Sequence, residues 1–390
     1  MCFATFAVQQ RKSDRKKRRI PFYAAYGNDR LQKICAEFAL LSMDAPNDAV
    51  MSLFAADLHT LGKRADAERD RRHGKKAYYV VNAHINPTNV CRIGCPLCAF
   101  AADSGNNGKK AYVLTIDEIL QRAEHAVRLG AVQLHLVSGV HPDKPYTWYQ
   151  EITQTLHQTF PQLWLKAWSA VEITAFAEST GKSYEFILSD LQSAGLSSLP
   201  GGGAEIFDSE IRQKIAPNKI PAEVWLDVHR TAHKLSIPTN ATMLFGHLET
   251  PKHRIEHLLQ LRALQEETGG FDCFVPLVFH PKNTPIEVTP ISPQEILKTI
   301  AVSRLVLDNI EHIKAYWVTL GESLAQIALS YGADDFDGTV YEERIHHEAG
   351  SLVPTGLPEE RLRELILDAG REPVLSPPRP QSILPNRIVP

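Results

Sequence analysis

The run Cys91-Arg92-Ile93-Gly94-Cys95-Pro96-Leu97-Cys98 brings three thiols close together in the chain. Three thiolates can hold a [4Fe–4S] cluster but leave it incomplete, because such a cluster normally takes four Cys ligands. One iron then keeps an open position for a small molecule. The alternative is a structural zinc site completed by a histidine such as His84. Such sites usually carry a second Cys pair roughly 12–20 residues away. The remaining cysteines are Cys2, Cys35 and Cys273, so the spacing predicts an iron–sulfur cluster.

Length and composition set the broad class of the chain. Its 390 residues are 44% hydrophobic and 22% charged, which are ordinary values for a globular protein. A net charge of −3 provides no field that attracts nucleic acid, and no apolar run is long enough to span a membrane. The basic block at residues 11–19 follows the apolar start, whereas a secretory signal has the reverse order. We therefore expect a cytoplasmic protein with reduced cysteines, whose residues 1–27 form a basic, flexible tail.

Two further segments flank the central part of the chain. Residues 28–77 carry apolar residues near helical period and predict an N-terminal helical layer. Residues 351–390 predict a C-terminal helix and a proline-rich tail, since proline interrupts regular structure.

Between these flanks, residues 78–350 alternate short apolar segments with amphipathic ones. The predicted strands are 78–83, 132–137, 163–168, 196–199, 239–244, 272–279, 312–318 and 334–337. The intervening stretches begin at capping motifs such as Thr115-Ile116-Asp117-Glu118. Strands joined through helices require a parallel sheet. We therefore predict an α/β fold, a TIM-type (β/α)8 barrel with an N-terminal helical extension.

The active site of such a barrel lies beyond the C-terminal ends of its strands. The cysteine run follows the first predicted strand, and several polar residues and glycines end or follow the others. They are Ser138, Gly139, Glu172, Gly202, Gly203, Glu205, Asn240 and Thr242. Each has a structural alternative, because glycines form turns, a glutamate caps a helix and buried polar groups are usually satisfied within the fold. Their position at one rim favours a ligand site, so these are the candidate cofactor-binding residues.

The cysteine spacing resembles that of the radical S-adenosylmethionine (SAM) enzymes. The resemblance implies that the three cysteines hold a [4Fe–4S] cluster and that SAM binds at its open iron. Reductive cleavage of SAM then releases a 5′-deoxyadenosyl radical. Members of this family usually have two glycines where this chain has Ser138 and Gly139, and an aromatic residue where it has Leu97.

Four longer runs resemble a narrower group within that family. These runs are Gly201–Phe207, Trp225–His233, Thr242–Thr250 and Glu266–Phe271. They are similar to aminofutalosine synthases, to dehypoxanthine futalosine cyclases and to the FO synthase subunits of deazaflavin synthesis. The run Phe279-His280-Pro281 resembles the synthases, whereas the cyclases tend to carry Gln in place of the histidine. The resemblance implies a synthase of the futalosine route to menaquinone, with the cyclase and the FO synthase subunit as alternatives.

The resemblance also implies a reaction in which SAM is a co-substrate. The radical adds to the vinyl carbon of an aromatic enolpyruvyl ether, 3-[(1-carboxyvinyl)oxy]benzoate. Aryl migration and loss of the pyruvyl carboxylate follow, and the product, 6-amino-6-deoxyfutalosine, retains the adenosyl group. Reduced flavodoxin or ferredoxin is the implied electron donor.

A substrate with two carboxylates needs cationic or hydroxyl donors around it, because an unpaired buried charge is costly. The candidates are His84, His280, Lys314, Arg344 and His347. Two of them, His84 and Lys314, lie on strands whose ends reach the rim, and with His280 they are the predicted catalytic residues. For Lys314, an ion pair with Asp335 or Asp337 is an equal alternative.

Overall fold

The structure, a computed structural model, describes residues 47–102 and 110–376. The predicted tail 1–27, the first part of the predicted helical layer (28–46) and the end of the proline-rich segment lie outside the described residues. The chain divides into units Met1–Pro46 and Asn47–Pro390, and all described residues belong to the second.

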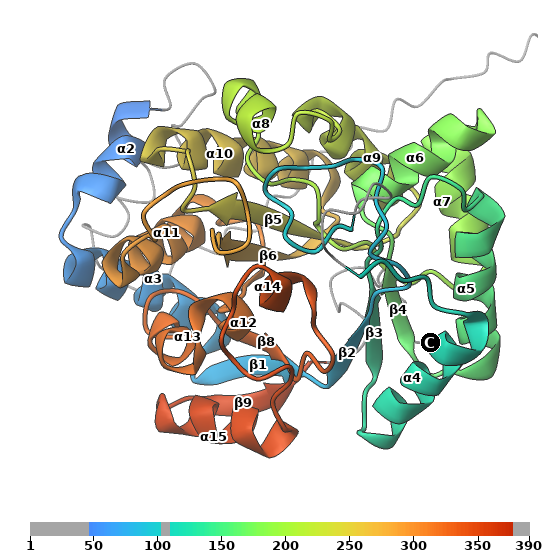
Figure 1. Ribbon diagram of the computed structural model, residues 1–390. Coiled ribbons are helices and arrows are strands. Elements are labelled where there is room, and N and C mark those ends of the chain that lie inside the picture. The colour runs from blue at the N-terminus through green and yellow to red at the C-terminus, as the bar shows by residue number, and fades with distance from the viewer. Residues whose placement is uncertain (1–46, 103–109, 377–390) are drawn as a thin grey trace, which may run out of the picture. The chain divides into compact units, whose positions relative to one another are not determined.

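Strands and helices alternate along the described chain (Figure 1). The strands are β1 (Lys76–Val80), β2 (Asn82–Ile85), β3 (Gln133–Leu136), β4 (Trp164–Ala167), β5 (Thr239–Phe245), β6 (Phe271–Val278), β7 (His312–Ile313), β8 (Asp335–Gly338) and β9 (Glu372–Leu375). The longer helices are α2 (Asn47–Ala55), α3 (Leu58–His73), α4 (Ile116–Arg128), α5 (Tyr146–Thr159), α6 (Ala170–Thr180), α7 (Tyr184–Ser193), α9 (Ala222–Lys234), α10 (Pro251–Thr268), α11 (Pro293–Val306) and α15 (Glu359–Asp368). The shorter helices are α8 (Ser209–Ile215), α12 (Trp317–Leu320), α13 (Glu322–Ala328) and α14 (Ile345–Glu348).

The strands close into a parallel barrel. β2, β3 and β4 pair in that order, as do β5, β6 and β7, and β8 pairs with β1. Single parallel bridges at Ser198 and Leu199 join β4 to β5, and a bridge at Lys314 joins β7 to β8. Since β2 directly continues β1 along the chain, these pairings complete the ring. The predicted TIM-type (β/α)8 barrel is thus confirmed.

The prediction of one continuous strand over residues 78–83 is wrong. It forms two strands that separate at Val81, β1 toward β8 and β2 toward β3. The side chain of Asn82 replaces strand pairing at this point, because its Oδ1 accepts a hydrogen bond from the backbone N–H of Val340 at 2.7 Å. A side-chain amide that bonds the backbone competes with the regular ladder.

Three other predicted segments differ from the structure. The predicted fourth strand, 196–199, is reduced to the two bridge residues. The predicted seventh strand, 312–318, is too long, because α12 begins at Trp317, whose buried indole N–H donates to the Gly338 carbonyl at 2.7 Å. The C-terminal segment contains the predicted helix, α15, but also β9, which pairs in parallel with β1. A sequence pattern alone did not reveal this last strand, because its residues are not buried and it forms by pairing with β1, far away in the chain.

Capping and burial hold the helices around the barrel. The predicted capping box at Thr115 and Glu118 is confirmed at the start of α4, and the Ser292 hydroxyl accepts a hydrogen bond from the Glu295 N–H at the start of α11. α3 packs against α11, and α2 against α10 and α11. Helices of the described ranges all fall short of the length and apolarity that crossing a membrane requires.

Candidate active site

The three cysteines lie on the loop between β2 and α4, half-buried, and none of them forms a disulfide. Backbone hydrogen bonds hold this loop in place. The Arg92 N–H donates to the Val140 carbonyl at 2.9 Å, and the Leu97 N–H donates to the Ile215 carbonyl at 3.1 Å. The side chain of Cys91 packs against a small apolar cluster around Val140. The loop is therefore anchored at both ends while its thiols remain accessible.

The donor set of this loop fits a cluster with one open iron. Three thiols are available there, and Cys273, the other cysteine in the described ranges, is buried on β6. Burial raises the pKa of Cys95 to about 11, so this thiol keeps its proton until a metal displaces it. Metal coordination deprotonates a thiol outright and releases the proton.

A largely buried ion pair lies beside the cysteine loop. The Lys219 Nζ is 2.5 Å from Oε1 of Glu205, one of the candidate cofactor-binding residues. Burial opposes the charge of Glu205, but Lys219 outweighs this effect and lowers the pKa of the carboxyl. The charge of Lys219 also acts on Cys95. Glu205 is thus already paired, and the lysine provides a positive charge beside the thiols.

The glycine run after the bridge at Leu199 forms a loop that Arg212 holds. The buried Arg212 guanidinium donates to the carbonyls of Gly203, at 3.2 Å, and Ala204, at 2.5 Å. Gly203 has a φ of 93°, a conformation that glycine adopts without strain. The Gly202 carbonyl accepts the indole N–H of Trp225 at 3.2 Å. The backbone conformation of Gly203 therefore favours glycine, whereas the hydrogen bond at Gly202 uses a carbonyl that any residue would offer.

The turn after β3 packs against the start of the cysteine loop. The Gly139 N–H donates to the Thr88 carbonyl at 2.9 Å, and a Cβ at Gly139 would collide with the Val90 carbonyl. The neighbouring Ser138 N–H donates to Oε1 of Glu172 at 2.8 Å. Glu172 is the third residue of α6, and burial raises its pKa to about 7. The structure thus brings Ser138, Gly139 and Glu172 together beside the cysteine loop, with Glu172 bound to the turn itself.

Polar side chains of neighbouring strands share one layer inside the barrel. His84, His135 and Lys166 are register partners on β2, β3 and β4, so their side chains leave the same face of the sheet. The rings of His84 and His135 lie 4.5 Å apart, edge to face, and burial lowers the pKa of His84 to about 4. From β5, Asn240 Oδ1 lies 3.4 Å from Lys166 Nζ.

Two other predicted residues each make a hydrogen bond to a backbone carbonyl of the fold. The hydroxyl of Thr242 donates to the Gly201 carbonyl at 2.6 Å, and Nε2 of His280 lies 3.1 Å from the Thr319 carbonyl. Burial lowers the pKa of His280, so its ring is a neutral donor toward that carbonyl.

Lys314 lies between two carboxylates. Its Nζ is 3.0 Å from Asp335 Oδ2 and 2.8 Å from Asp337 Oδ1. Burial opposes the charge of Lys314, but these two carboxylates outweigh it and raise the pKa well above its usual value. The structure therefore contains the ion pairs that the sequence left as an equal alternative to substrate binding.

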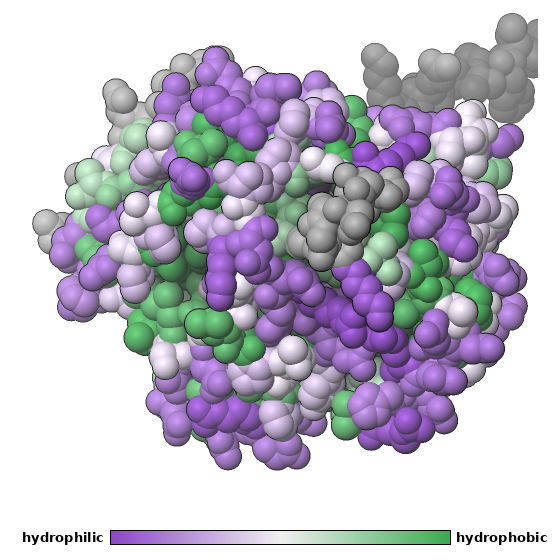
Figure 2. All heavy atoms as spheres, in the orientation of Figure 1, coloured by the Kyte–Doolittle hydropathy of each residue, from purple (hydrophilic) through white to green (hydrophobic). Residues whose placement is uncertain are grey.

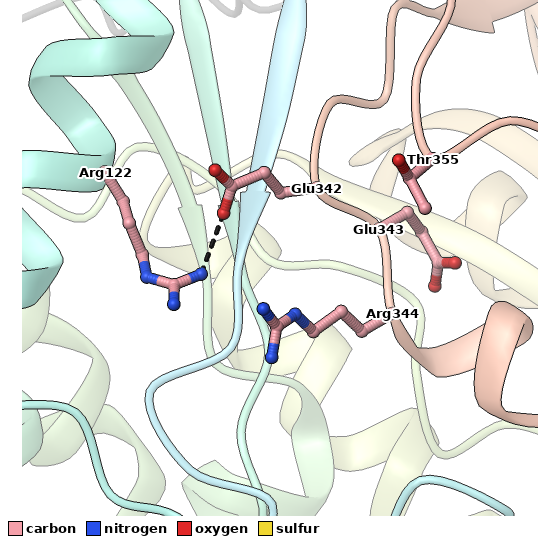
Figure 3. A pocket seen from close by; sticks show the side chains of 5 residues that line it. All are labelled: Arg122, Glu342, Glu343, Arg344 and Thr355. Carbon is pink, nitrogen blue, oxygen red and sulfur yellow. Dashed lines mark hydrogen bonds and ion pairs between the residues drawn. The ribbon is translucent and has the colours of Figure 1, made fainter.

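A cavity of about 370 Å³ lies between α4 and the loop after β8 (Figure 3). Its lining residues are Arg122, Glu342, Glu343, Arg344 and Thr355. Arg122 pairs with Glu342 at 2.8 Å, and the Arg344 side chain extends toward them while the Glu343 carboxylate points away. Glu343 instead accepts from Nδ1 of His347 at 2.7 Å. Figure 2 shows strongly hydrophilic side chains gathered on this face between α14 and α4.

The sequence pattern missed three residues that shape the site. Lys166 carried a usable signal, because it is the only charged residue in the apolar run Leu163–Trp168. Lys219 and Arg212 carried none, since both lie among other charged residues in and after α8 and only the fold turns them inward.

Comparisons with known proteins agree with this fold and this loop. Residues 85–261 match the model of the radical SAM superfamily, and residues 268–382 match that of the CofH/MqnC C-terminal region. The chain is 44% identical to an aminodeoxyfutalosine synthase of Thermus thermophilus, over 84% of this chain and 89% of that protein. It is 41% identical to an aminodeoxyfutalosine synthase of Streptomyces coelicolor, over 84% and 87% of the two chains.

Among solved structures, the crystal structure of methylornithine synthase matches 83% of this chain and 93% of its own, with a TM-score of 0.67 at 18% identity. At that identity the match shows the fold alone. The barrel and the cysteine loop, together with these matches, define an enzyme of the radical SAM superfamily, whose members use a [4Fe–4S] cluster and SAM. Within this superfamily the chain belongs to the family of the aminodeoxyfutalosine synthases and their CofH/MqnC relatives.

Proposed function

We propose that this chain catalyses the synthesis of 6-amino-6-deoxyfutalosine from SAM and 3-[(1-carboxyvinyl)oxy]benzoate, on the futalosine route to menaquinone. The observation that carries the proposal is the 44% identity to the aminodeoxyfutalosine synthase of Thermus thermophilus, over 89% of the length of that protein. The run Phe279-His280-Pro281 after β6 supports the synthase rather than the cyclase. The cysteine loop and the barrel supply the setting for such a reaction.

We propose that Cys91, Cys95 and Cys98 bind the cluster. When bound, the cluster supplies the electron that cleaves SAM, and its open iron holds the methionine end of that molecule. The half-buried thiols on an anchored loop support this role. Lys219 offsets part of the negative charge that three thiolates bring to the loop.

We propose that SAM lies along the strand ends between the cysteine loop and the barrel interior. Ser138 and Gly139 lie in the turn beside the loop, where Glu172 holds the N–H of Ser138 and Gly139 allows the close backbone contact with Val90. The loop that follows the bridge at Leu199 carries Gly202, Gly203 and Glu205, and β5 carries Asn240 and Thr242. His84 and His280 remain the proposed substrate-facing residues, joined at the rim by Arg344 of the cavity. The ion pairs of Lys314 argue for a structural role instead.

The main contribution of the protein is to position the two substrates. A carbon-centred reaction of this kind needs close approach of the reacting atoms and exclusion of stray hydrogen donors. The barrel interior supplies buried walls, and its polar residues are paired within the fold at Lys314, Glu205 and Thr242. We also propose that residues 78–350 form the catalytic barrel, that a reduced flavodoxin or ferredoxin donates the electron, and that the enzyme works in the cytoplasm.

Product analysis tests this proposal. Anaerobically reconstituted enzyme, SAM and dithionite are incubated either with the enolpyruvyl benzoate or with dehypoxanthine futalosine. We expect an adduct that contains adenine from the first and no product from the second. Formation of free 5′-deoxyadenosine with a cyclised futalosine product would instead identify the enzyme as the cyclase.

A further inference from the structure

Lys166 is a buried cation without an ion pair among the described residues. It lies near the C-terminal end of β4 and is 8% exposed. Its Nζ makes one long hydrogen bond, 3.4 Å to the neutral amide oxygen of Asn240, and no carboxylate in the described ranges comes within 4.0 Å. A buried ammonium normally pairs with an anion, because its desolvation is otherwise uncompensated.

The neighbouring histidine is also incompletely bonded. Nε2 of His135 is buried and has no hydrogen-bond partner in the described part of the chain. His135 is the register partner of Lys166, and its ring contacts His84 on the other side. A neutral imidazole keeps one N–H donor. Lys166 and His135 together therefore present a positive charge and one buried ring nitrogen without a partner, on one face of the barrel interior.

The acidic groups of the interior do not supply the missing partner. Asp337 is close enough for Lys166 to lower the pKa of its carboxyl, but its Oδ1 is bound to Lys314 at 2.8 Å. Asp335 is bound to the same lysine at 3.0 Å. The two buried lysines thus differ, since Lys314 has two carboxylates and Lys166 has none in contact.

We propose that Lys166 and His135 form a subsite for the ring carboxylate of the enolpyruvyl benzoate, an inference that rests on the proposed function. The substrate brings the carboxylate that Lys166 lacks. The ring carboxylate suits this subsite better than the enolpyruvyl carboxylate does. The ring carboxylate is carried into the product, whereas the enolpyruvyl carboxylate is lost in the reaction. An ion pair with an unreacting group strengthens binding of substrate and transition state alike, so it acts on KM more than on kcat.

The test compares Lys166→Met with the wild-type enzyme on two ligands. One ligand is the enolpyruvyl benzoate, and the other is the analogue in which a carboxamide replaces the ring carboxylate. For the wild type, we expect the benzoate to have a KM about 10- to 100-fold below that of the carboxamide, the range expected for a charged hydrogen bond. Lys166→Met should raise the KM for the benzoate by the same factor, more than it lowers kcat, and change the KM for the carboxamide less than threefold. Iron content and thermal unfolding of both proteins show that the variant is folded.

Either of two results overturns the subsite. The first is a wild-type enzyme that takes benzoate and carboxamide with equal KM, which requires no variant to fold. The second is a Lys166→Met variant that loses affinity for both ligands equally or for neither. The wild-type product separates this from a failure of the proposed function. If the wild type forms the adenine-containing adduct, only the subsite is in question, and if it forms no adduct, both proposals fall.

Discussion

The carboxylate of Glu172 holds the backbone of Ser138, with 2.8 Å between Oε1 and the amide nitrogen. Oε2 accepts from the N–H of Ser169 at 2.6 Å. One buried carboxylate thereby ties the turn after β3 to the start of α6. The sequence offered Glu172 as a direct cofactor contact, but its two oxygens serve the turn that borders the cysteine loop. We propose that Glu172 acts on SAM binding through the position of Ser138 and Gly139.

Glu172 should make stability depend on pH in the acidic to neutral range. Burial raises its pKa to about 7 from the usual 4.5, so between these values the folded state binds more protons than the unfolded state. Stability therefore falls as the pH rises from about 4.5 through 7, by on the order of 3 kcal/mol. Glu172→Gln should lack this decline in urea unfolding at several pH values. The exposed variant Glu185→Gln is the control and should keep the wild-type pH profile. A Glu172→Gln variant with that same profile would refute the raised pKa of Glu172.

His312 should produce a second decline in stability, in the same direction, at higher pH. Burial disfavours its charged form, but the hydrogen bond to Asp334, at 2.6 Å, outweighs burial and raises the pKa to about 9. The resulting stability is fully present below about pH 6.5 and is lost as the pH rises through 9, again on the order of 3 kcal/mol. His312→Asn should flatten the unfolding free energy between pH 6.5 and 9. The exposed control His125→Asn should keep the wild-type slope, and a His312→Asn variant with the same slope would contradict the prediction.

The two buried lysines should differ in their contribution to stability. Lys314→Met leaves the carboxylates of Asp335 and Asp337 buried without their cation, which costs about 3–5 kcal/mol. Lys166→Met breaks no ion pair and should change the free energy of unfolding by less than about 1 kcal/mol. Chemical denaturation of both variants measures the contrast. Equal losses from the two substitutions would show that the pairing seen at Lys314 has no energetic weight.

The cysteines of the loop and the cysteine of β6 should behave differently. Cys95→Ala removes one of three proposed ligands, so iron after anaerobic reconstitution should fall from about four per chain to near zero, and SAM cleavage should cease. Cys273 is 1% exposed on β6, and Cys273→Ala should keep its iron and lose at most about 1 kcal/mol of stability. Iron analysis and visible absorption report the outcome. SAM cleavage by Cys95→Ala would exclude this residue as a ligand.

The sequence predicted the barrel well because its strands are short apolar runs between capped helices, as at Thr115 and Ser292. It failed where pairing depends on distant partners. The break at Val81 follows from the Asn82 side chain meeting Val340, and β9 forms only because β1 offers it a free edge. No local pattern contains either contact.

For the site, the sequence located the cysteine loop and the strand ends but not the pairing of charges. Lys314 and Lys166 are both single lysines near strand ends. Only the register of β7 with β8 places Asp335 beside one of them and leaves the other without a carboxylate. Which buried lysine is available to a ligand is therefore a property of the fold.

The fate of the adenosyl group distinguishes addition to the substrate from simple hydrogen abstraction. Reconstituted enzyme receives SAM labelled with ¹³C in its ribose, together with dithionite and 3-[(1-carboxyvinyl)oxy]benzoate, and the products are separated by liquid chromatography and mass spectrometry. We expect the ribose label in one compound that also carries the aryl group and the adenine. Recovery of the label solely in free 5′-deoxyadenosine, or in uncleaved SAM, would contradict this expectation.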